Sequence, residues 1–358
     1  MSHLQQAPGR ASTETTVLRR GSTIAGMGRS IPPRVVTNAE IERLVDTTDE
    51  WVRTRTGIRE RRVVAEGVAT SDLAVEAAQE ALRDAGVNAD DIDLIIVGTA
   101  SPDMLFPATA CLVQDRLGAR RAGAFDASAA CSSWAYAVAM GHAAIAAGTA
   151  DTVLVVGAEA LSRITDWTDR DTCVLFGDAA AAVVLRPCDP GVGFLAFHLG
   201  SDGSGGSLIC LPGGGSRFPA SAETVARRDH YIKMNGREVY KFAVRAIPRA
   251  IAHVAAAAGV AVEDVDCFVP HQANIRIIEA AAQRLGQPMS KFFVNVERYG
   301  NTSSASVPVA LYEAVEQGRI RAGDLVIFVA FGGGLTWGAA TMRWTGGMLR
   351  GARDGISR

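Results

Sequence analysis

The sequence lacks any apolar run near the roughly 20 residues that a membrane-spanning helix needs. Its six cysteines lie far apart, at positions 111, 131, 173, 188, 210 and 267, and its six histidines are equally scattered. That spacing gives no zinc signature and argues against a disulfide framework. A net charge of −2 argues against a nucleic-acid binder that works by bulk charge. We therefore expect no metal.

The N-terminal segment is polar and has no signal-peptide core, so we expect a cytoplasmic protein. Hydrophobic residues make up 48% and charged residues 21% of the 358 residues. These fractions are typical of a globular protein with a sizeable core.

Two stretches of the sequence resemble each other. The first, "ALRDAGVNADDIDLIIVGTA", ends at Ala100, and the second, "HVAAAAGVAVEDVDCFVPHQA", ends at Ala273. An offset of 173 residues pairs Asp93 with Asp266, and the same offset pairs "DTVLVVGA" with "DLVIFVAF". A constant offset over such a distance indicates an internal duplication.

Each copy is predicted to contain a helix, an acidic turn, a buried strand, a segment of small residues and a final buried strand. The apolar strands "IDLIIVGT" and "TVLVVGA" are typical of a sheet covered on both faces. The Ala-rich helix at about 130–147, with Gly148 as its C-cap, is expected to be buried all round. The Pro- and Gly-containing stretch 186–193 suits a linker. The expected organisation is a flexible tail (1–20), a first half (21–190), a second half (191–345) and a C-terminal tail (346–358).

The polar residues that differ between the two copies occur at the ends of equivalent strands. The offset carries Cys131 onto Ser304, and it carries Gly98 onto His271. If the halves pack about a pseudo-twofold axis, Cys131, His271 and Asn301 can converge on one site. Each residue alone also has an ordinary interpretation, as a core thiol, a satisfied core histidine or a turn residue.

Cys131 is expected in the first turn of a helix, where backbone N–H groups favour the thiolate and lower the pKa. The three glycines of "AFGGGLTWG", residues 330–338, allow the backbone to approach a ligand closely. They could aim an N–H group at a developing oxyanion or form only a tight turn.

Two further motifs have alternative interpretations. The five arginines and one tryptophan of "EWVRTRTGIRERR", residues 50–62, form either a solvated face or a site for phosphates and a stacked base. The "GMGRSI" segment begins like a dinucleotide fingerprint but lacks the final glycine, and Pro32 and Pro33 block the helix that should follow. That fingerprint is weak and disfavours a nicotinamide dehydrogenase.

In these motifs the chain resembles β-ketoacyl-acyl-carrier-protein synthase III, a family of the thiolase superfamily. The resemblance runs from about Thr23 to Arg343. It implies a five-layered αβαβα fold of two duplicated halves, and a homodimer. The matching pieces are "DEWVRTRTGIRERR", "FDASAACSS", "TDRDTCVLFGDAAAAVVL", "VPHQANIRI", "ERYGNTSSASVP" and "FGGGLTWGAA".

The resemblance also implies roles for individual residues. It makes Cys131, His271 and Asn301 a catalytic triad, with oxyanion N–H groups from Cys131 and Gly333. The remaining implied residues are Trp51, Arg55 and Arg170 for coenzyme A, Phe106, Phe176 and Phe331 for the acyl pocket and condensation chamber, and Lys241 and Arg276 for docking an acidic carrier protein.

The implied reaction condenses a short acyl-CoA with malonyl-acyl-carrier protein, with loss of carbon dioxide and without a cofactor, and starts fatty-acid synthesis. A large ring at position 106 resembles acetyl-preferring members, and small branched starters stay open. Ser132-Ser133-Trp134 departs from the Ala-Gly-Phe of many members, which puts the loop geometry and the acyl preference in doubt.

Three alternatives remain. One is a starter-unit synthase of polyketide or other secondary metabolism, and another is an acyl transferase of the same superfamily. The third, from another class, is a non-catalytic subunit that binds carrier protein. A thiolase is disfavoured because "FGGGLTWG" contains no second cysteine. An elongating synthase is disfavoured because such enzymes use two histidines, whereas Asn301 stands at the third position here.

Overall fold

The computed structural model describes residues 20–346, and almost all of the two expected tails, 1–19 and 347–358, lies outside the described residues. Within the described part of the chain, no helix is long and apolar enough to cross a membrane. Within the same residues, no group of three or more His, Cys, Asp or Glu side chains could hold a metal ion. All six cysteines are free thiols.

The first half builds a five-stranded sheet in which β4, β5 and β6 run parallel and β7 and β1 pair antiparallel. Every residue of β6 is buried, as its continuous apolar sequence predicts for a strand covered on both faces. In spatial order the strands are β1 (Gly21–Ser30), β7 (Ala179–Cys188), β6 (Val153–Glu159), β4 (Leu94–Gly98) and β5 (Gly123–Ala127).

The second half builds a four-stranded sheet with the corresponding order. Its first pair of strands is parallel and the other pairs are antiparallel. In spatial order the strands are β11 (Cys267–Pro270), β12 (Leu325–Gly332), β13 (Thr336–Arg343) and β8 (Gly193–Ser201).

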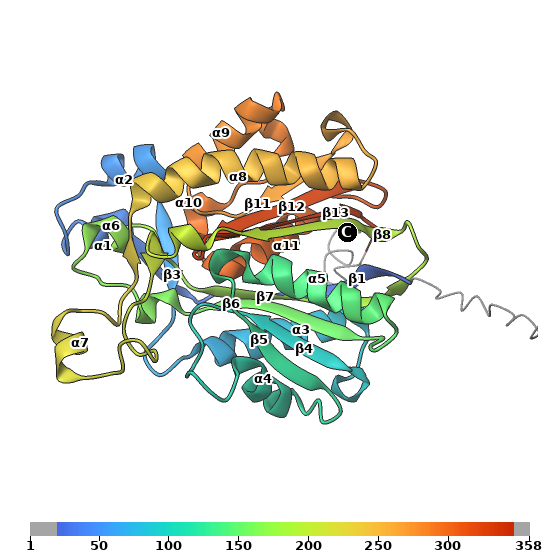
Figure 1. Cartoon of the computed structure of the whole chain (residues 1–358), viewed down its shortest axis with the longest axis horizontal. Helices are drawn as coiled ribbons and strands as arrows, with labels where there is room; N and C mark the ends of the chain where they lie inside the picture. Colours follow the sequence, from blue (N-terminus) through green and yellow to red (C-terminus); the bar gives the residue numbers. More distant parts are fainter. Residues whose placement is uncertain (1–19, 347–358) are drawn as a thin grey trace, which may run out of the picture.

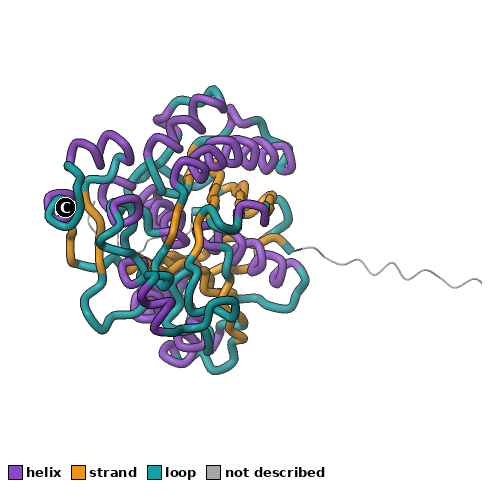
Figure 2. The backbone as a smooth tube through the Cα atoms, turned by 60° about the vertical axis from the view of Figure 1, so that its left-hand side comes forward, coloured by secondary structure: helices purple, strands orange, loops and turns teal. Residues whose placement is uncertain are grey.

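Helices separate and cover the two sheets, so the chain forms five layers (Figure 1). In the tube view the strands lie between helices at the top and bottom of the molecule (Figure 2). The expected αβαβα architecture is therefore present. The outer helices of the first sheet are α3 (Thr70–Ala85) and α4 (Thr109–Leu117), the central pair is α5 (Ser133–Ala146) and α11 (Ser306–Glu316), and the outer helices of the second sheet are α8 (Gly236–Ala257) and α9 (Ile275–Leu285).

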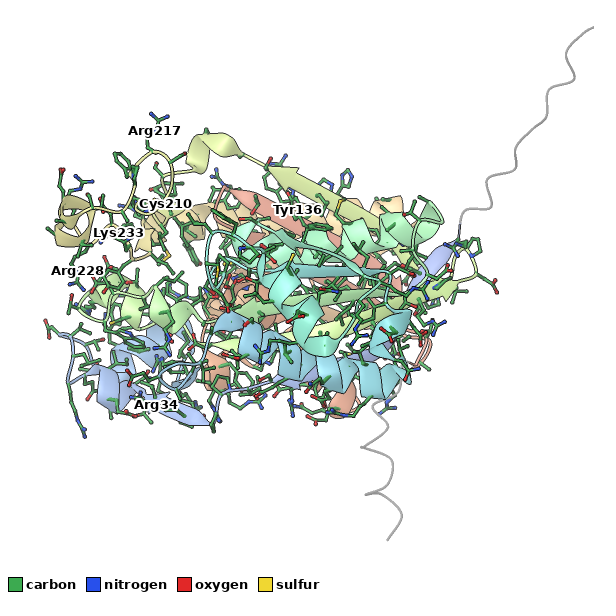
Figure 3. All side chains as sticks on the ribbon, turned by 90° about the horizontal axis from the view of Figure 1, so that it is seen from below. Arg34, Tyr136, Cys210, Arg217, Arg228 and Lys233 are labelled. Atoms are coloured by element: carbon green, nitrogen blue, oxygen red, sulfur yellow. The ribbon has the colours of Figure 1, made fainter. Side chains whose placement is uncertain are left out.

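Shorter elements gather at one end of the layers. The segment that carries Arg217 and Arg228 lies at this end of the molecule, away from Tyr136 (Figure 3). The elements are β2 (Arg34–Thr37) paired with β3 (Glu60–Val63), β9 (Ile209–Cys210) paired with β10 (Lys233–Met234), and the helices α1 (Asn38–Ile41), α2 (Asp49–Thr56), α6 (Arg170–Cys173), α7 (Ala222–Ala226) and α10 (Val296–Tyr299).

The duplication predicted from the sequence is visible in the coordinates. Strands β4 and β11 begin at Leu94 and Cys267, which are 173 residues apart. Helices α5 and α11 begin at Ser133 and Ser306, with the same separation. The expected linker is shorter than residues 186–193, because β7 extends to Cys188 and β8 begins at Gly193. On this ground we propose the division of the chain into halves at residues 190 and 191.

The "GMGRSI" segment lies in strand β1. A β-carbon on Gly26 would lie 2.4 Å from the Ala85 nitrogen, and one on Gly28 would lie 2.2 Å from the Ala77 oxygen. The glycines therefore allow α3 to pack directly on β1. This close packing explains why glycines stand at these positions, and no dinucleotide-binding role is needed to explain them.

Helix α5 is less buried than expected. Trp134 is buried in the core and meets Phe328 edge to face, with ring centres 5.8 Å apart. Met140, however, is 46% exposed, so the prediction of a helix buried all round was wrong for that face. The two sheets cover two sides of the helix, and the side that carries Met140 is left exposed.

A buried carboxylate on α11 joins the two halves. Glu313, with its side chain 2% exposed, accepts hydrogen bonds from Arg29 of β1 at 3.1 Å and Arg298 at 2.7 Å. It also accepts from the Tyr299 hydroxyl at 2.5 Å and the Asn295 amide at 2.9 Å. Because these donors come from both halves, Glu313 ties β1 to the segment just before Asn301.

Replacing this carboxylate should destabilise the fold. Glu313→Ala leaves the buried donors Tyr299 and Asn295 without their acceptor, and we expect the free energy of unfolding to fall by about 2–4 kcal/mol. Glu316→Ala is the matched control, because Glu316 is on the same helix, contacts Arg29 at 3.2 Å and is 40% exposed. It should cost at most about 1 kcal/mol. Urea unfolding followed by circular dichroism compares the two, and equal losses would contradict the assignment.

Candidate active site

Cys131 lies in a short 3-10 helix, Ala130–Ser132, between β5 and α5. The residue before it, Ala130, has φ 48°, a left-handed conformation that residues other than glycine rarely adopt. The Ser133 hydroxyl accepts from the Ala129 N–H at 2.8 Å and donates to the Ala130 carbonyl at 2.7 Å. These bonds hold the turn that places Cys131 against the cavities described below.

Ser132 links the cysteine turn to the glycine loop after β12. Its hydroxyl lies 2.8 Å from the Ala129 carbonyl and 2.7 Å from the Thr336 hydroxyl. The Thr336 hydroxyl in turn donates to the Gly333 carbonyl at 3.0 Å. Ser132, which departs from the alanine of many family members, therefore links the two backbone segments by hydrogen bonds.

At Gly332 the chain approaches the cysteine turn too closely for a side chain, and Gly333 lies close to β9. A β-carbon on Gly332 would lie 2.6 Å from the Cys131 nitrogen, and one on Gly333 would lie 3.1 Å from the Ile209 oxygen. Gly333 and Cys131 together border both cavities of the site. The two residues predicted to supply oxyanion N–H groups therefore border the same space.

Asn301 is held by backbone bonds to the segment around Phe176. Its N–H donates to the Leu175 carbonyl at 2.8 Å, and its carbonyl accepts from the Gly177 N–H at 3.0 Å. The Asn301 side-chain oxygen accepts from the Ser303 N–H at 2.8 Å. Since the oxygen is occupied by this donor, the NH₂ group is the part of the amide left for a ligand.

His271 follows the last residue of β11 and is 1% exposed. Its Nδ1 lies 2.5 Å from the Ser306 hydroxyl, and its ring meets Phe331 edge-on with centres 5.2 Å apart. Nε2 is buried and has no hydrogen-bond partner among the described residues. Burial lowers the pKa of His271 to about 3, so the imidazole is neutral at physiological pH.

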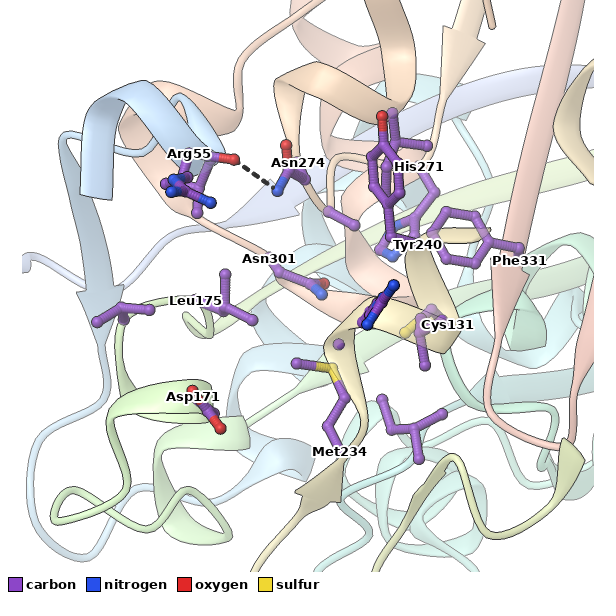
Figure 4. A pocket seen from close by; sticks show the side chains of 18 of the residues that line it. Arg55, Cys131, Asp171, Leu175, Met234, Tyr240, His271, Asn274, Asn301 and Phe331 are labelled. Atoms are coloured by element: carbon purple, nitrogen blue, oxygen red, sulfur yellow. Dashed lines mark hydrogen bonds between the residues drawn. The ribbon is translucent and has the colours of Figure 1, made fainter. Parts of the chain in front are cut away.

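These three side chains border one cavity of about 330 Å³, although they come from different halves. Figure 4 shows Cys131, His271 and Asn301 around it, with Phe331 at one side. The convergence expected from the repeat is therefore present. The other lining residues include Trp51, Arg55, Met234, Tyr240, Asn274, Gly332 and Gly333.

The protonation state of Cys131 differs from the expectation. Burial raises the pKa of the thiol to about 12, and the negative charge of Glu159 adds to the rise. The helix start was expected to lower this pKa, but desolvation is the larger effect because the residue is only 7% exposed. The free thiol is therefore neutral at physiological pH.

Glu159, at the end of β6, was not found by sequence reasoning. It accepts from the Ser101 hydroxyl at 2.6 Å and the Ala100 N–H at 3.1 Å, and from the Ser304 N–H of the second half at 3.3 Å. Burial raises its pKa to about 7. In the sequence it stands in an apolar strand with no motif to mark it, and only the fold brings it next to Ser101 and to Ser304 of the other half.

The aromatic and basic residues predicted for coenzyme A lie together. The Arg170 guanidinium carbon is 4.3 Å from the centre of the Trp51 ring, and that of Arg55 is 5.7 Å away. Trp51 and Arg55 line the 330 Å³ cavity. Arg170 does not line it, but it lies over the Trp51 ring. The Arg170 Nε is buried without a partner among the described residues.

A second cavity of about 190 Å³ also borders Cys131 and contains Phe176. Phe331 lines the first cavity instead. Phe106 lines neither cavity, because it sits in a loop and is 84% exposed. Within one chain the structure therefore does not bring Phe106 to Phe176 or Phe331, the other residues predicted for the acyl pocket and condensation chamber. The other residues of this second cavity include Leu161, Ile164, Ile209, Cys210, Leu211 and Ile232.

The two residues predicted to dock a carrier protein are exposed on neighbouring helices of the second half. Lys241 is on α8 and pairs with Glu238 at 2.7 Å. Arg276 is in the first turn of α9, and these two helices pack against each other. The lining of the 330 Å³ cavity includes Arg237 and Ile277 from the same two helices.

The comparisons with known proteins agree with this geometry. Residues 125–203 match the model of the 3-oxoacyl-[acyl-carrier-protein] synthase III family, and residues 255–344 match the model of its C-terminal part. The β-ketoacyl-[acyl-carrier-protein] synthase III of Symbiobacterium thermophilum is 57% identical over 321 residues, covering 90% of this chain and 97% of that protein. The chain belongs to the β-ketoacyl-acyl-carrier-protein synthase III family.

Solved structures of the synthase III family share the fold. That of the Thermus thermophilus enzyme is 50% identical, with a TM-score of 0.84 and coverage of 90% of this chain and 99% of that one. The priming β-ketosynthase of the R1128 polyketide pathway has the same TM-score at 35% identity, with coverage of 91% and 97%. The expected thiolase-like fold is confirmed.

The neutral state of the buried thiol predicts a specific pH dependence. Below a pKa of about 12 the thiolate fraction rises about tenfold with each pH unit. Alkylation of Cys131 by iodoacetamide in the free enzyme should therefore accelerate steadily from pH 7 to pH 10. Peptide mass spectrometry measures the rate, with Cys131→Ala as the background. A plateau below pH 9 would show that the turn stabilises the thiolate after all.

Proposed function

We propose that this chain condenses a short acyl-CoA with malonyl-acyl-carrier protein, with loss of carbon dioxide, to give a β-ketoacyl-acyl-carrier protein that starts fatty-acid synthesis. It is an acyltransferase of the synthase III type. The observation that carries the proposal is the convergence of Cys131, His271 and Asn301 on one cavity. No metal or redox cofactor takes part, because both substrates arrive as activated thioesters.

In the first half-reaction the Cys131 sulfur attacks the acyl-CoA carbonyl, and its proton passes to the departing coenzyme A sulfur. The N–H groups of Cys131 and Gly333 hold the oxyanion, since the glycine loop lies against the cysteine turn. Coenzyme A enters beside Trp51, with Arg55 and Arg170 near the indole for the base and phosphates.

In the second half-reaction the malonyl carbonyl sits between His271 and Asn301. When carbon dioxide leaves, the electron pair forms an enolate whose oxygen these two groups stabilise as hydrogen-bond donors. The enolate carbon attacks the acyl-cysteine carbonyl. The bond to sulfur breaks, the β-ketoacyl product stays on its carrier, and Cys131 takes a proton back from solvent.

Other parts of the proposal concern partners and location. Lys241 and Arg276 are exposed on two helices that also contribute residues to the cavity lining, which suits docking of an acidic carrier protein. Phe176 and Phe331 bound the acyl and condensation spaces. We place the enzyme in the cytoplasm, where its proposed substrates are found.

A homodimer accounts for the position of Phe106. Large apolar side chains are exposed at Met104, Leu105 and Phe106, with Phe125 of edge strand β5 and Met140 of α5 also exposed. Such apolar groups suit an interface between two copies. In a dimer Phe106 would bound the acyl pocket of the partner subunit rather than its own.

A second candidate function is starter-unit synthesis for a polyketide, which the likeness to the R1128 priming ketosynthase favours. The 57% identity to a synthase III supports fatty-acid initiation more strongly. Incubation with a panel of acyl-CoAs, followed by mass spectrometry of the Cys131 peptide, identifies the starter. Turnover with different malonyl carriers then separates the two pathways, and absence of any adduct would refute the enzymatic proposal.

The two half-reactions should respond differently to loss of Asn301. Asn301→Ala removes one enolate donor, so we expect condensation to fall by about 10²–10³. Acylation of Cys131 by acyl-CoA should stay largely intact, because the oxyanion donors are elsewhere. Single-turnover acylation and steady-state condensation measure the two steps. Equal loss in both would refute the division of roles.

The dimer proposal predicts a linked change in assembly and activity. Leu105→Asp places a charge at the exposed apolar loop, where Leu105 is 78% exposed, and should shift the protein to monomers with low condensation activity. Val225→Asp is the control, because Val225 is 64% exposed on α7 and belongs to none of the proposed interface residues. Light scattering during gel filtration reads the mass. A wild-type monomer with full activity would contradict the dimer.

A further inference from the structure

Ser306, the first residue of α11, lies beside the proposed enolate donor His271. Both side chains are buried, with exposures of 2% and 1%, and the Ser306 hydroxyl is 2.5 Å from the imidazole Nδ1. Either atom can be the donor in a serine–histidine pair, so the bond alone does not say which ring nitrogen carries the hydrogen.

The surroundings of Ser306 decide the direction of this bond. The Gln272 N–H points at the Ser306 oxygen from 3.4 Å, so this oxygen already faces one donor. Among the described residues, His271 is the only acceptor placed to receive the Ser306 hydrogen. If Nδ1 carried the hydrogen instead, the Ser306 oxygen would face two donors and its own hydrogen would have no acceptor. A buried hydroxyl without an acceptor costs about 1–3 kcal/mol.

We propose that Ser306 is a positioning residue that fixes the tautomer of His271, by donating its hydrogen to Nδ1 and so keeping the ring hydrogen on Nε2. This inference rests on the proposed function, because it concerns how His271 stabilises the enolate. Nε2 has no partner among the described residues and lies against the cavity that Cys131 and Asn301 share. The histidine thus presents an N–H group, not a lone pair, to the malonyl carbonyl.

The same arrangement applies to Asn301. The Ser303 N–H occupies the side-chain oxygen of Asn301 and leaves its NH₂ group for the substrate. Two neighbouring residues, Ser303 and Ser306, therefore make both polar side chains act as donors toward one oxygen. Neither orientation depends on the substrate, so no reorganisation is needed when the enolate forms.

Comparison with the first half shows that this contact is not a general property of the repeat. Ser133 occupies the equivalent position at the start of α5, and its hydroxyl bonds only to backbone groups of Ala129 and Ala130. The residue equivalent to His271 is Gly98, which has no side chain to orient. The serine of the second half thus contacts a side chain for which the first half has no counterpart.

The test measures the tautomer directly and does not depend on activity. In wild-type enzyme labelled with ¹⁵N-histidine, two-bond ¹H–¹⁵N spectra should show His271 with its hydrogen on Nε2. The signal is assigned by its disappearance in His271→Asn. A hydrogen on Nδ1 in the wild type would overturn the proposal, whatever the variants do.

The variants then connect the tautomer to the chemistry. Ser306→Ala should bring the Nδ1–H tautomer into the spectrum and reduce both decarboxylation of the malonyl thioester and condensation by about 10–100-fold. Acylation of Cys131 should change less than about twofold, because His271 takes no part in it. Ser306→Thr retains the hydroxyl and should recover most of the lost condensation rate.

The control is a second serine–histidine pair. Ser22 is fully buried, and its hydroxyl lies 2.8 Å from Nδ1 of the half-buried His142. His142 is toward the C-terminal end of α5 and lines neither of the cavities that Cys131 borders. Ser22→Ala should change the His142 signal and leave His271 and condensation as in the wild type. An unchanged His271 tautomer in Ser306→Ala, or equal loss of acylation and condensation, would overturn the proposal. Failure of the proposed function would appear separately, as a missing acyl adduct on Cys131 with the tautomer still fixed.

Discussion

The site depends on the close packing of two repeat-related turns, Ala130–Ser132 from one half and Ser303–Ala305 from the other. A β-carbon on Gly157 of β6 would lie 2.6 Å from the Ser304 carbonyl oxygen, so the second turn packs directly against the first sheet. Both turns carry a strained residue at the same position, with φ 48° at Ala130 and 46° at Ser303. The surrounding layers must hold this strain, and Glu313 and Glu159 are the buried carboxylates that join the halves around it.

The two turns share a backbone conformation but carry different side chains. At one turn the side chain after the strained residue is the thiol of Cys131, and at the other it is the hydroxyl of Ser304, which donates to the Gly98 carbonyl. In the mechanism we propose, the first half provides the nucleophile Cys131, and the second half provides the enolate donors His271 and Asn301. The oxyanion of the acylation step would be held jointly, by the N–H of Cys131 from the first half and that of Gly333 from the second.

Much of this could be predicted from the sequence. The constant offset revealed the duplication, and the polar residues at equivalent strand ends located Cys131, His271 and Asn301. The same offset relates Ser133 to Ser306, so Ser306 could have been singled out too, but a serine at a helix start usually serves the backbone. The raised pKa of Cys131 could not be predicted, because it depends on how completely the layers exclude water. The position of Phe106 could not be predicted either, because its loop points away from the cavity of its own chain.

The glycine at the end of β4 limits which side chains the position can carry. Gly98 occupies the position that His271 holds in the other copy, yet a β-carbon there would lie within 2.8–3.0 Å of Ser133 and Trp134. A side chain at position 98 would therefore require the start of α5 to move away from β4. The difference between Gly98 and His271 is thus maintained by the same close packing that holds Cys131 and Ser133 against the first sheet.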